Sequence, residues 1–142
     1  MNRTAITPYL FFSGRCDEAL AFYQKELGAN VEAIMRFNQS PAPAPEGMLQ
    51  AGFENKVMHA SFQIGGVRIM CSDGCNDQGK MEGFKLALAA PTEEVAHQYF
   101  NALAAEGKIE MPLTKTFWSP CYGMLTDKFG VEWMVMLYQD VG

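Results

Sequence analysis

Residues 66–70 read Gly-Val-Arg-Ile-Met, and residues 130–134 read Gly-Val-Glu-Trp-Met. The two pentapeptides are nearly the same, and they begin 64 residues apart (130 − 66), close to half of the 142-residue chain. Self-similarity at a fixed spacing is typical of a structural unit that is used more than once. The sequence therefore predicts one unit used twice.

A second match supports the repeat. Segments 17–27 and 93–103 both begin with two acidic residues and an aliphatic one, followed by tyrosine and leucine at the same spacing, at an offset of 76 residues (93 − 17). The first half must then hold 12 residues (76 − 64) that the second half lacks. Residues 38–55, with Pro41, Pro43 and Pro45 at every second position, are the obvious insertion.

Length and charge limit the function classes. With 142 residues, of which 49% are hydrophobic, the chain suffices for one compact core but not for two independent domains, so we expect a single domain. The net charge of −5 and the absence of a basic stripe argue against nucleic acid and anionic membranes as partners. Small molecules or proteins remain.

The sequence predicts neither a membrane-spanning helix nor a secretion signal. No apolar run approaches the roughly 20 residues of a transmembrane helix, and the N-terminus lacks a basic stretch followed by an apolar one. Four cysteines are few for a disulfide scaffold, and the spacing of Cys71 and Cys75 is not that of a zinc ribbon. We expect a cytoplasmic protein with free thiols.

The pattern of apolar residues predicts the same element order in each half. The first half has a strand at 6–12, a helix whose apolar stripe runs from Cys16 to Leu27 and stops at Gly28, and strands at 31–37, 57–64 and 67–71. The second half has a strand at 84–90, a helix capped by Thr92 and closing at Gly107, and strands at 109–117, 122–126 and 131–138. The fold class is therefore α+β, with β-α-β-β-β twice.

A paired β-α-β-β-β chain of this length resembles the vicinal oxygen chelate superfamily, the fold of glyoxalase I, bleomycin-resistance proteins and extradiol dioxygenases. Residues 116–133 are similar to the signature of its PhnB-like subfamily, and residues 9–12, 16–19, 58–60 and 70–73 also match. The resemblance implies one glyoxalase-like domain, with module 1 at about 5–73 and module 2 at about 82–140. It also implies sheets that curl around a cavity and a homodimer that completes or covers it.

Proteins of this subfamily also carry the label 3-demethylubiquinone-9 3-methyltransferase domain. The sequence has no glycine-rich strand-to-helix loop of the kind that cradles a nucleotide cofactor. We therefore do not predict a methyltransferase activity, and we expect no cofactor.

The resemblance further implies a divalent metal held by the first and last strand of each module. The repeat offsets place these positions at Pro8, Met70, Phe84 and Met134, none of which is a ligand for a hard metal. A shift by one residue gives Tyr9, Cys71, Lys85 and Val135, which is no better. We expect no metal site of the usual kind. The alternative is a metal-dependent lyase, isomerase or dioxygenase whose ligands have moved, to His59, Asp73 or Glu132.

His59 is the candidate catalytic residue. It lies on the strand before the first hairpin, and imidazole is the side chain whose ordinary pKa suits proton transfer near neutrality. A hydrogen-bonded core or interface histidine is the alternative. His97 lies off the apolar stripe of its helix, so we expect it to face solvent.

Further candidates surround the predicted cavity. Asp73 could anchor a polar group of a ligand or activate His59, but an aspartate before glycine is also ordinary in turns. Trp118, Tyr122 and Trp133 could form flat walls for a planar ligand, or could pack the sheet against its helix.

The sequence thus favours a binding protein for a small, partly apolar metabolite or xenobiotic. Met70, Phe84 and Met134 form an apolar cavity floor in this hypothesis. The predicted ligand-binding residues are Tyr9, His59, Met70, Asp73, Phe84, Trp118, Tyr122 and Met134. An enzyme that uses His59 as a base and an interaction module with a filled cavity are the alternatives.

Overall fold

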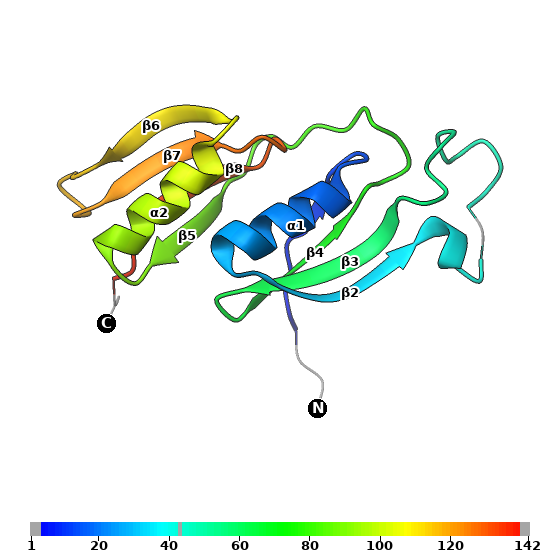
Figure 1. Cartoon of the computed structure of the whole chain (residues 1–142), viewed down its shortest axis with the longest axis horizontal. Coiled ribbons are helices and arrows are strands. Elements are labelled where there is room, and N and C mark those ends of the chain that lie inside the picture. The colour runs from blue at the N-terminus through cyan, green and yellow to red at the C-terminus, as the bar shows by residue number, and fades with distance from the viewer. Residues whose placement is uncertain (1–3, 43, 140–142) are drawn as a thin grey trace. The chain divides into compact units, whose positions relative to one another are not determined.

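The computed structural model describes residues 4–42 and 44–139 (Figure 1). The chain divides into two compact units, residues 1–80 and 81–142. Among the residues described, each unit holds one α-helix of 12 residues and one four-stranded sheet. In the described part of the chain, no helix is long and apolar enough to cross a membrane.

The first unit contains a four-stranded sheet with the strand order β1-β4-β3-β2. Its elements are β1 (Tyr9–Phe11), α1 (Cys16–Leu27), β2 (Asn30–Arg36), a 3₁₀ turn (Phe37–Gln39), β3 (Val57–Ile64) and β4 (Val67–Ser72). Strand β1 runs parallel to β4, and the other neighbours are antiparallel. The parallel pair forms because α1 and β2 carry the chain across before β3 and β4 return as a hairpin.

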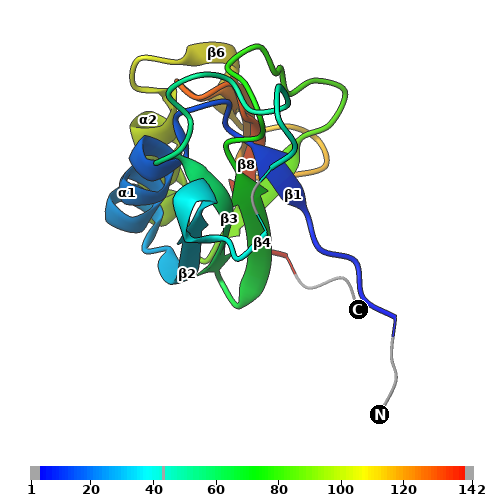
Figure 2. The same cartoon turned by 90° about the vertical axis from the view of Figure 1, so that its right-hand side faces the viewer.

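Helix α1 covers one face of this sheet (Figures 1 and 2). Its buried residues recur at helical spacing, at Cys16, Ala19, Leu20, Tyr23 and Leu27. The ring of Tyr23 stacks on Phe62 of β3 with 5.8 Å between ring centroids. The helix ends at Gly28, whose φ of 67° is the left-handed conformation that glycine adopts without strain.

The second unit repeats the order, with the sheet β5-β8-β7-β6. Its elements are β5 (Leu86–Ala90), α2 (Glu93–Ala104), β6 (Lys108–Thr114), β7 (Tyr122–Thr126) and β8 (Glu132–Leu137). The hydroxyl of Thr92 accepts the N–H of Val95 at 3.1 Å, so the predicted N-cap is present. The prediction of two β-α-β-β-β modules is confirmed.

Several predicted strands and helices were longer than the elements in the structure. Strand β1 covers only Tyr9–Phe11, and β5 begins at Leu86, so Phe84 precedes its strand. Helix α2 ends at Ala104, and β6 ends at Thr114. Apolar residues beyond the last paired residue of a strand continue the sequence pattern, but they form no hydrogen bonds to a neighbouring strand.

The connection between β2 and β3 spans residues 37–56, whereas the equivalent connection between β6 and β7 spans only 115–121. The longer connection holds the predicted insertion at 38–55. Of its three alternating prolines, Pro41 and Pro45 are described, and Pro43 lies outside the described residues.

Candidate functional site

Each sheet has one face that its own helix does not cover, and we call it the open face. On β1, Leu10 is buried toward α1 with 1% of its surface exposed, so Tyr9 and Phe11 point to the open face. Strand β4 contributes Met70, which pairs with Tyr9 in the parallel ladder. Strand β3 contributes His59. The open face of the first sheet thus brings together three of the predicted ligand-binding residues.

Tyr9 and His59 are joined directly. The Tyr9 hydroxyl and the Nδ1 atom of His59 lie 3.1 Å apart, and the two rings lie 5.7 Å apart between centroids. Burial raises the pKa of the Tyr9 phenol, and the nearby Cys71 raises it further. The phenol therefore keeps its proton at neutral pH. Within the described part of the chain, Nε2 of His59 has no hydrogen-bond partner and is available to a ligand.

A salt-bridged group lies at the hairpin end of the same face. The Glu32 carboxylate accepts hydrogen bonds from Arg68 Nε at 2.8 Å, from Arg68 Nη2 at 3.1 Å and from Gln63 Nε2 at 2.9 Å. The hydrogen bond from Arg68 holds the pKa of Glu32 below its usual value. The open face of the first sheet therefore passes from an aromatic and imidazole end to an ionic end.

The second sheet carries a comparable ionic group. Lys85 Nζ donates to Glu132 Oε1 at 2.8 Å and to Glu110 Oε2 at 3.2 Å, while the Thr126 hydroxyl donates to Glu110. The hydrogen bond to Glu132 is the largest of the effects that raise the pKa of Lys85. The ammonium is thus held charged between two carboxylates.

An open pocket of about 400 Å³ lies beside this ionic group. It is lined by Gly83, Phe84, Lys85, Glu132 and Met134. Phe84 and Met134 were predicted from the sequence, whereas Lys85 and Glu132 were not in the predicted ligand set. Glu132 could have been found, because it lies two residues before Met134 and therefore points to the same face of β8.

Trp118 and Tyr122 form an aromatic pair, and Trp133, the third aromatic residue of the predicted cluster, is not part of it. The rings of Trp118 and Tyr122 meet edge to face at 5.4 Å, and Phe117 meets Trp118 at 4.7 Å. Trp133 is buried instead, and its Nε1 donates to Asp127 Oδ2 at 2.9 Å. The hypothesis of a three-residue aromatic wall is wrong, because residues 133 and 134 point to opposite faces of β8.

Asp73 does not have a free carboxylate. It is 1% exposed, and its oxygens accept three backbone N–H groups: Gly14 at 2.9 Å, Cys16 at 2.7 Å and Val57 at 2.8 Å. The two carboxylate oxygens therefore bind backbone N–H groups at the start of α1 and at the start of β3. We therefore remove Asp73 from the predicted ligand-binding set and from the alternative metal ligands.

Strand pairing corrects the correspondence between the two modules. Met70 of β4 pairs with Ser61 of β3, and its counterpart Met134 of β8 pairs with Met124 of β7. The strands before the two hairpins therefore correspond at an offset of 63 residues (124 − 61), whereas the strands after the hairpins correspond at 64. The hairpin of the second module is one residue longer. The counterpart of His59 is therefore Tyr122, and not Gly123, which the 64-residue offset of the pentapeptides would give.

The same pairing corrects the first-strand positions. The partner of Met70 in β1 is Tyr9, and the partner of Met134 in β5 is Ala87. Pro8 and Phe84, which the repeat offset selected, do not occupy these positions. The offset failed because the loop between strand and helix is not of equal length in the two modules.

The donor chemistry at these four positions does not fit a hard divalent metal. A neutral phenol, two thioethers and a methyl group replace the imidazoles and carboxylates that such ions prefer. Among the described residues there is no group of three or more His, Cys, Asp or Glu side chains that could hold a metal ion.

His97 and the cysteines do not form part of a reactive group. His97 is exposed on α2. The cysteines are free thiols, and Cys16 and Cys71 are both buried with their sulfur atoms 3.6 Å apart. The hydrogen bond with Cys71 and burial raise the pKa of Cys16, so this thiol is not activated as a nucleophile.

Comparison with known proteins gives a consistent result. The family model described as 3-demethylubiquinone-9 3-methyltransferase matches residues 4–136. The chain is 38% identical over 138 residues to Protein YjdN of Escherichia coli (strain K12), covering 92% of each chain. The crystal structure of protein PA1353 from Pseudomonas aeruginosa has 38% sequence identity and a TM-score of 0.83, over 97% of this chain and 100% of that one.

A PhnB protein from Bacillus cereus, described as a putative 3-demethylubiquinone-9 3-methyltransferase, is 30% identical with a TM-score of 0.78, over 95% of this chain and 100% of that one. The fosfomycin resistance protein FosX from Listeria monocytogenes shares the fold alone, at 11% identity and a TM-score of 0.62, over 97% of this chain and 93% of that one. The predicted resemblance is confirmed: the chain belongs to the family described as 3-demethylubiquinone-9 3-methyltransferase, whose PhnB-like members have the vicinal oxygen chelate fold.

Proposed function

We propose that this protein binds a small, partly apolar organic molecule in the pocket lined by Phe84, Lys85, Glu132 and Met134. The observation that carries the proposal is the composition of this pocket, which has a volume of about 400 Å³. Its wall combines an exposed phenyl ring and a thioether with a fixed ion pair. Binding sites for small molecules usually combine an apolar lining with a few placed polar groups.

The pocket favours a particular kind of ligand. The ring of Phe84, 44% exposed, offers a flat surface to an apolar or aromatic part. The ion pair of Lys85 and Glu132 offers both a donor and an acceptor at one end. A ligand with an apolar body and one polar group that both donates and accepts hydrogen bonds matches this arrangement.

We extend the proposed ligand-binding set to the open face of the first sheet and to the aromatic pair of the second. Tyr9, His59 and Met70 support a ligand surface because they are adjacent and are not covered by α1. Trp118 and Tyr122 support it because Trp118 is 51% exposed although it is a large aromatic side chain.

A second candidate function is acid–base catalysis by His59. The hydrogen bond between Tyr9 and Nδ1 favours it, since a fixed imidazole with a free Nε2 can accept or donate a proton at a bound substrate. A metal-dependent lyase, isomerase or dioxygenase has less support, because Asp73 is fully engaged by backbone groups and Glu132 is paired with Lys85. Metal-free action is therefore part of the proposal.

The methyltransferase activity named in the family description is not part of the proposal. The connection between β1 and α1 contains one glycine, Gly14, and the connection between β5 and α2 contains none. A nucleotide cofactor site between strand and helix typically needs several glycines for close backbone approach.

We further propose that the two units form a single domain and that the protein is a cytoplasmic homodimer without nucleic-acid partners. The length of the chain, its acidic composition and its free thiols support these proposals. Light scattering across the micromolar range measures the oligomeric state, and a purely monomeric protein would contradict the dimer.

The test of the ligand proposal is a thermal-shift screen against metabolites and aromatic drugs. A ligand at about 100 times its dissociation constant stabilises the native state by roughly 2.7 kcal/mol, which is easily measured. Each hit is then repeated with Phe84→Ala and with Tyr138→Ala as a matched control, since Tyr138 is 62% exposed and lies outside the pocket. We expect Phe84→Ala to weaken binding and Tyr138→Ala to leave it unchanged. Equal effects of both substitutions would reject this pocket.

A further inference from the structure

The insertion between β2 and β3 is folded onto the first unit by its own contacts. The backbone N–H of Gln50 donates to the carbonyl of Cys75 at 2.8 Å, and the Gln50 side chain accepts the N–H of Asp77 at 3.0 Å. Phe53 is buried with 4% of its surface exposed. The second module has no equivalent segment, so the βαβββ architecture does not require it.

The base of the insertion is fixed as well. Backbone bonds join Phe37 N to Lys56 O at 3.2 Å and Asn38 N to Glu54 O at 2.9 Å, and the Asn38 side chain donates to that of Asn55. Residues 37–39 form one 3₁₀ turn. Hydrogen bonds therefore hold the two ends of the insertion together next to β2 and β3.

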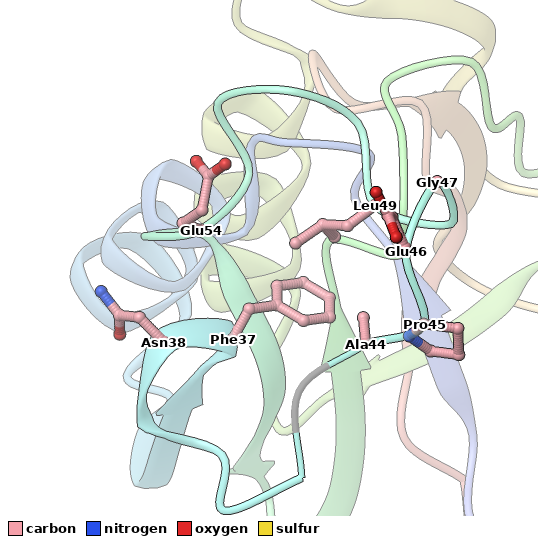
Figure 3. Close-up of a pocket in the computed structure, with 8 residues that line it drawn as sticks. All are labelled: Phe37, Asn38, Ala44, Pro45, Glu46, Gly47, Leu49 and Glu54. Atoms are coloured by element: carbon pink, nitrogen blue, oxygen red, sulfur yellow. The ribbon is translucent and has the colours of Figure 1, made fainter.

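Between the arms lies a pocket of about 300 Å³ (Figure 3). Its apolar lining consists of Phe37, Ala44, Pro45 and Leu49. In Figure 3 the side chains of Phe37 and Leu49 point toward one another across this space. Neither residue is fully buried, although both are large and apolar. An apolar surface of this kind gains stability when a ligand covers it.

The charges at this pocket have one sign. Glu46 and Glu54 belong to the lining, and no basic residue does. In the part of the chain that the structure describes, neither carboxylate has an ion-pair partner. The rim therefore carries two negative charges beside an apolar floor.

The basic residues nearest to the pocket in sequence, Arg36 and Lys56, already have hydrogen-bond partners outside the pocket lining. Both terminal nitrogens of Arg36 donate hydrogen bonds to the Asp17 carboxylate at 2.9 Å, and Nη1 also donates to the carbonyl oxygen of Asn55 at 2.9 Å. Lys56 Nζ donates to the carbonyl of Gly14 at 2.8 Å. These cations do not neutralise the rim from within the pocket.

From this geometry we propose that the insertion pocket is a second binding site, specific for a small organic cation with an apolar body, such as a protonated aryl- or alkylamine. The apolar part lies against Phe37 and Leu49, and the ammonium is attracted by the negative charges of Glu46 and Glu54, which lie on opposite sides of the pocket in Figure 3. The phenyl face of Phe37 adds attraction for a cation. A hydrated metal ion does not match, because five of the eight lining residues offer no side-chain oxygen.

The experiment follows amide chemical shifts of the ¹⁵N-labelled protein during titration with benzylammonium and, separately, with neutral benzyl alcohol at low ionic strength. These probes have the same ring and differ in charge. We expect both to shift backbone amides of the non-proline residues within 37–54, and benzylammonium to bind about three-fold more tightly. High salt removes this preference, because exposed charges are screened.

Charge-neutral variants localise the effect. We expect Glu46→Gln and Glu54→Gln each to weaken benzylammonium binding about two-fold, and the double variant to bind both probes equally. Glu106→Gln, an exposed carboxylate of the second unit, is the matched control and leaves binding unchanged. Both pocket carboxylates are exposed, so the variants fold normally and unfolding midpoints verify this.

Three results would overturn the proposal: equal affinity for the neutral and charged probes in the native sequence, shifts confined to residues outside 37–54, or no shift at millimolar probe. Shifts centred on Lys85 and Met134 would instead report the pocket of the second unit. The two sites are thus distinguished by which amides respond.

Discussion

The Tyr9 hydroxyl and His59 Nδ1 lie 3.1 Å apart, although their strands are not neighbours in the sheet. Strand β4 lies between β1 and β3, so the two side chains reach toward one another over its open face. The bond fixes the orientation of the imidazole relative to Met70 on β4.

The first prediction concerns His59. We expect His59→Ala to lower ligand binding or turnover several-fold while costing only about 1 kcal/mol of unfolding free energy, because the bond to Tyr9 is partly exposed. His97→Ala, on the exposed side of α2, changes neither quantity. Paired urea-unfolding and binding curves measure both effects. A loss of several kcal/mol would show that His59 is a structural residue.

The second prediction concerns Asp73. Its buried carboxylate joins the start of α1 to β3 through three backbone N–H groups, so Asp73→Ala leaves these donors without a partner. We expect a loss of about 3 kcal/mol or more in urea unfolding. Asp77→Ala, an exposed carboxylate a few residues later, is the control and changes stability by less than about 0.5 kcal/mol. Similar losses in both variants would contradict this role.

The third prediction concerns Gly123 on β7. A Cβ atom at this position would lie 2.9 Å from the carbonyl oxygen of Met111 and 2.9 Å from Cε2 of Phe100. Because the carbonyl belongs to the neighbouring strand, it cannot move aside, and we expect Gly123→Ala to cost about 3 kcal/mol. Gly130→Ala has open space but a φ of 91°, so its cost is about 1–2 kcal/mol. Chemical denaturation compares the two, and a neutral Gly123→Ala would refute the close packing of α2 on β7.

The fourth prediction concerns pH. Both terminal nitrogens of Arg36 donate to Asp17 at 2.9 Å, and these hydrogen bonds lower the pKa of Asp17 from its ordinary value of 3.8. A carboxyl whose pKa is lower in the folded state stabilises the protein above its unfolded pKa, and this stabilisation is lost as the pH falls through the folded pKa.

Asp17 is half exposed, so we expect Asp17→Asn to cost only about 0.5–1 kcal/mol near neutral pH. The difference between variant and native protein shrinks below about pH 4. Urea unfolding across this range measures it. A difference that stays constant as the pH falls would show that the charge of Asp17 contributes nothing.

The fifth prediction is that purified protein holds no stoichiometric Zn, Ni, Mn or Fe. Tyr9, Met70, Ala87 and Met134 offer no adequate ligand set at the strand positions where the resemblance implies a metal. Elemental analysis is the measurement. About one tightly held ion per chain, released when these residues are replaced, would refute the prediction and favour the metal-dependent alternative.

The sequence by itself determined the repeated β-α-β-β-β order and the burial of α1. Apolar spacing is a local property, and Gly28 and Thr92 mark helix ends through their own backbone preferences, so these features need no knowledge of distant contacts. Successive side chains of a strand point to opposite faces of its sheet, so the sequence also sufficed to place Trp133 and Met134 on opposite faces of β8. The hypothesis of an aromatic wall overlooked this alternation.

Only the tertiary structure decided which residues meet. Strand register depends on the length of each loop, and one extra residue in the second hairpin replaced Gly123 by Tyr122 as the counterpart of His59. The capture of Asp73 by three backbone groups and the bond between Tyr9 and His59 join residues at least 16 positions apart. Such contacts depend on how strands and helix are packed, and no local pattern of residues encodes them.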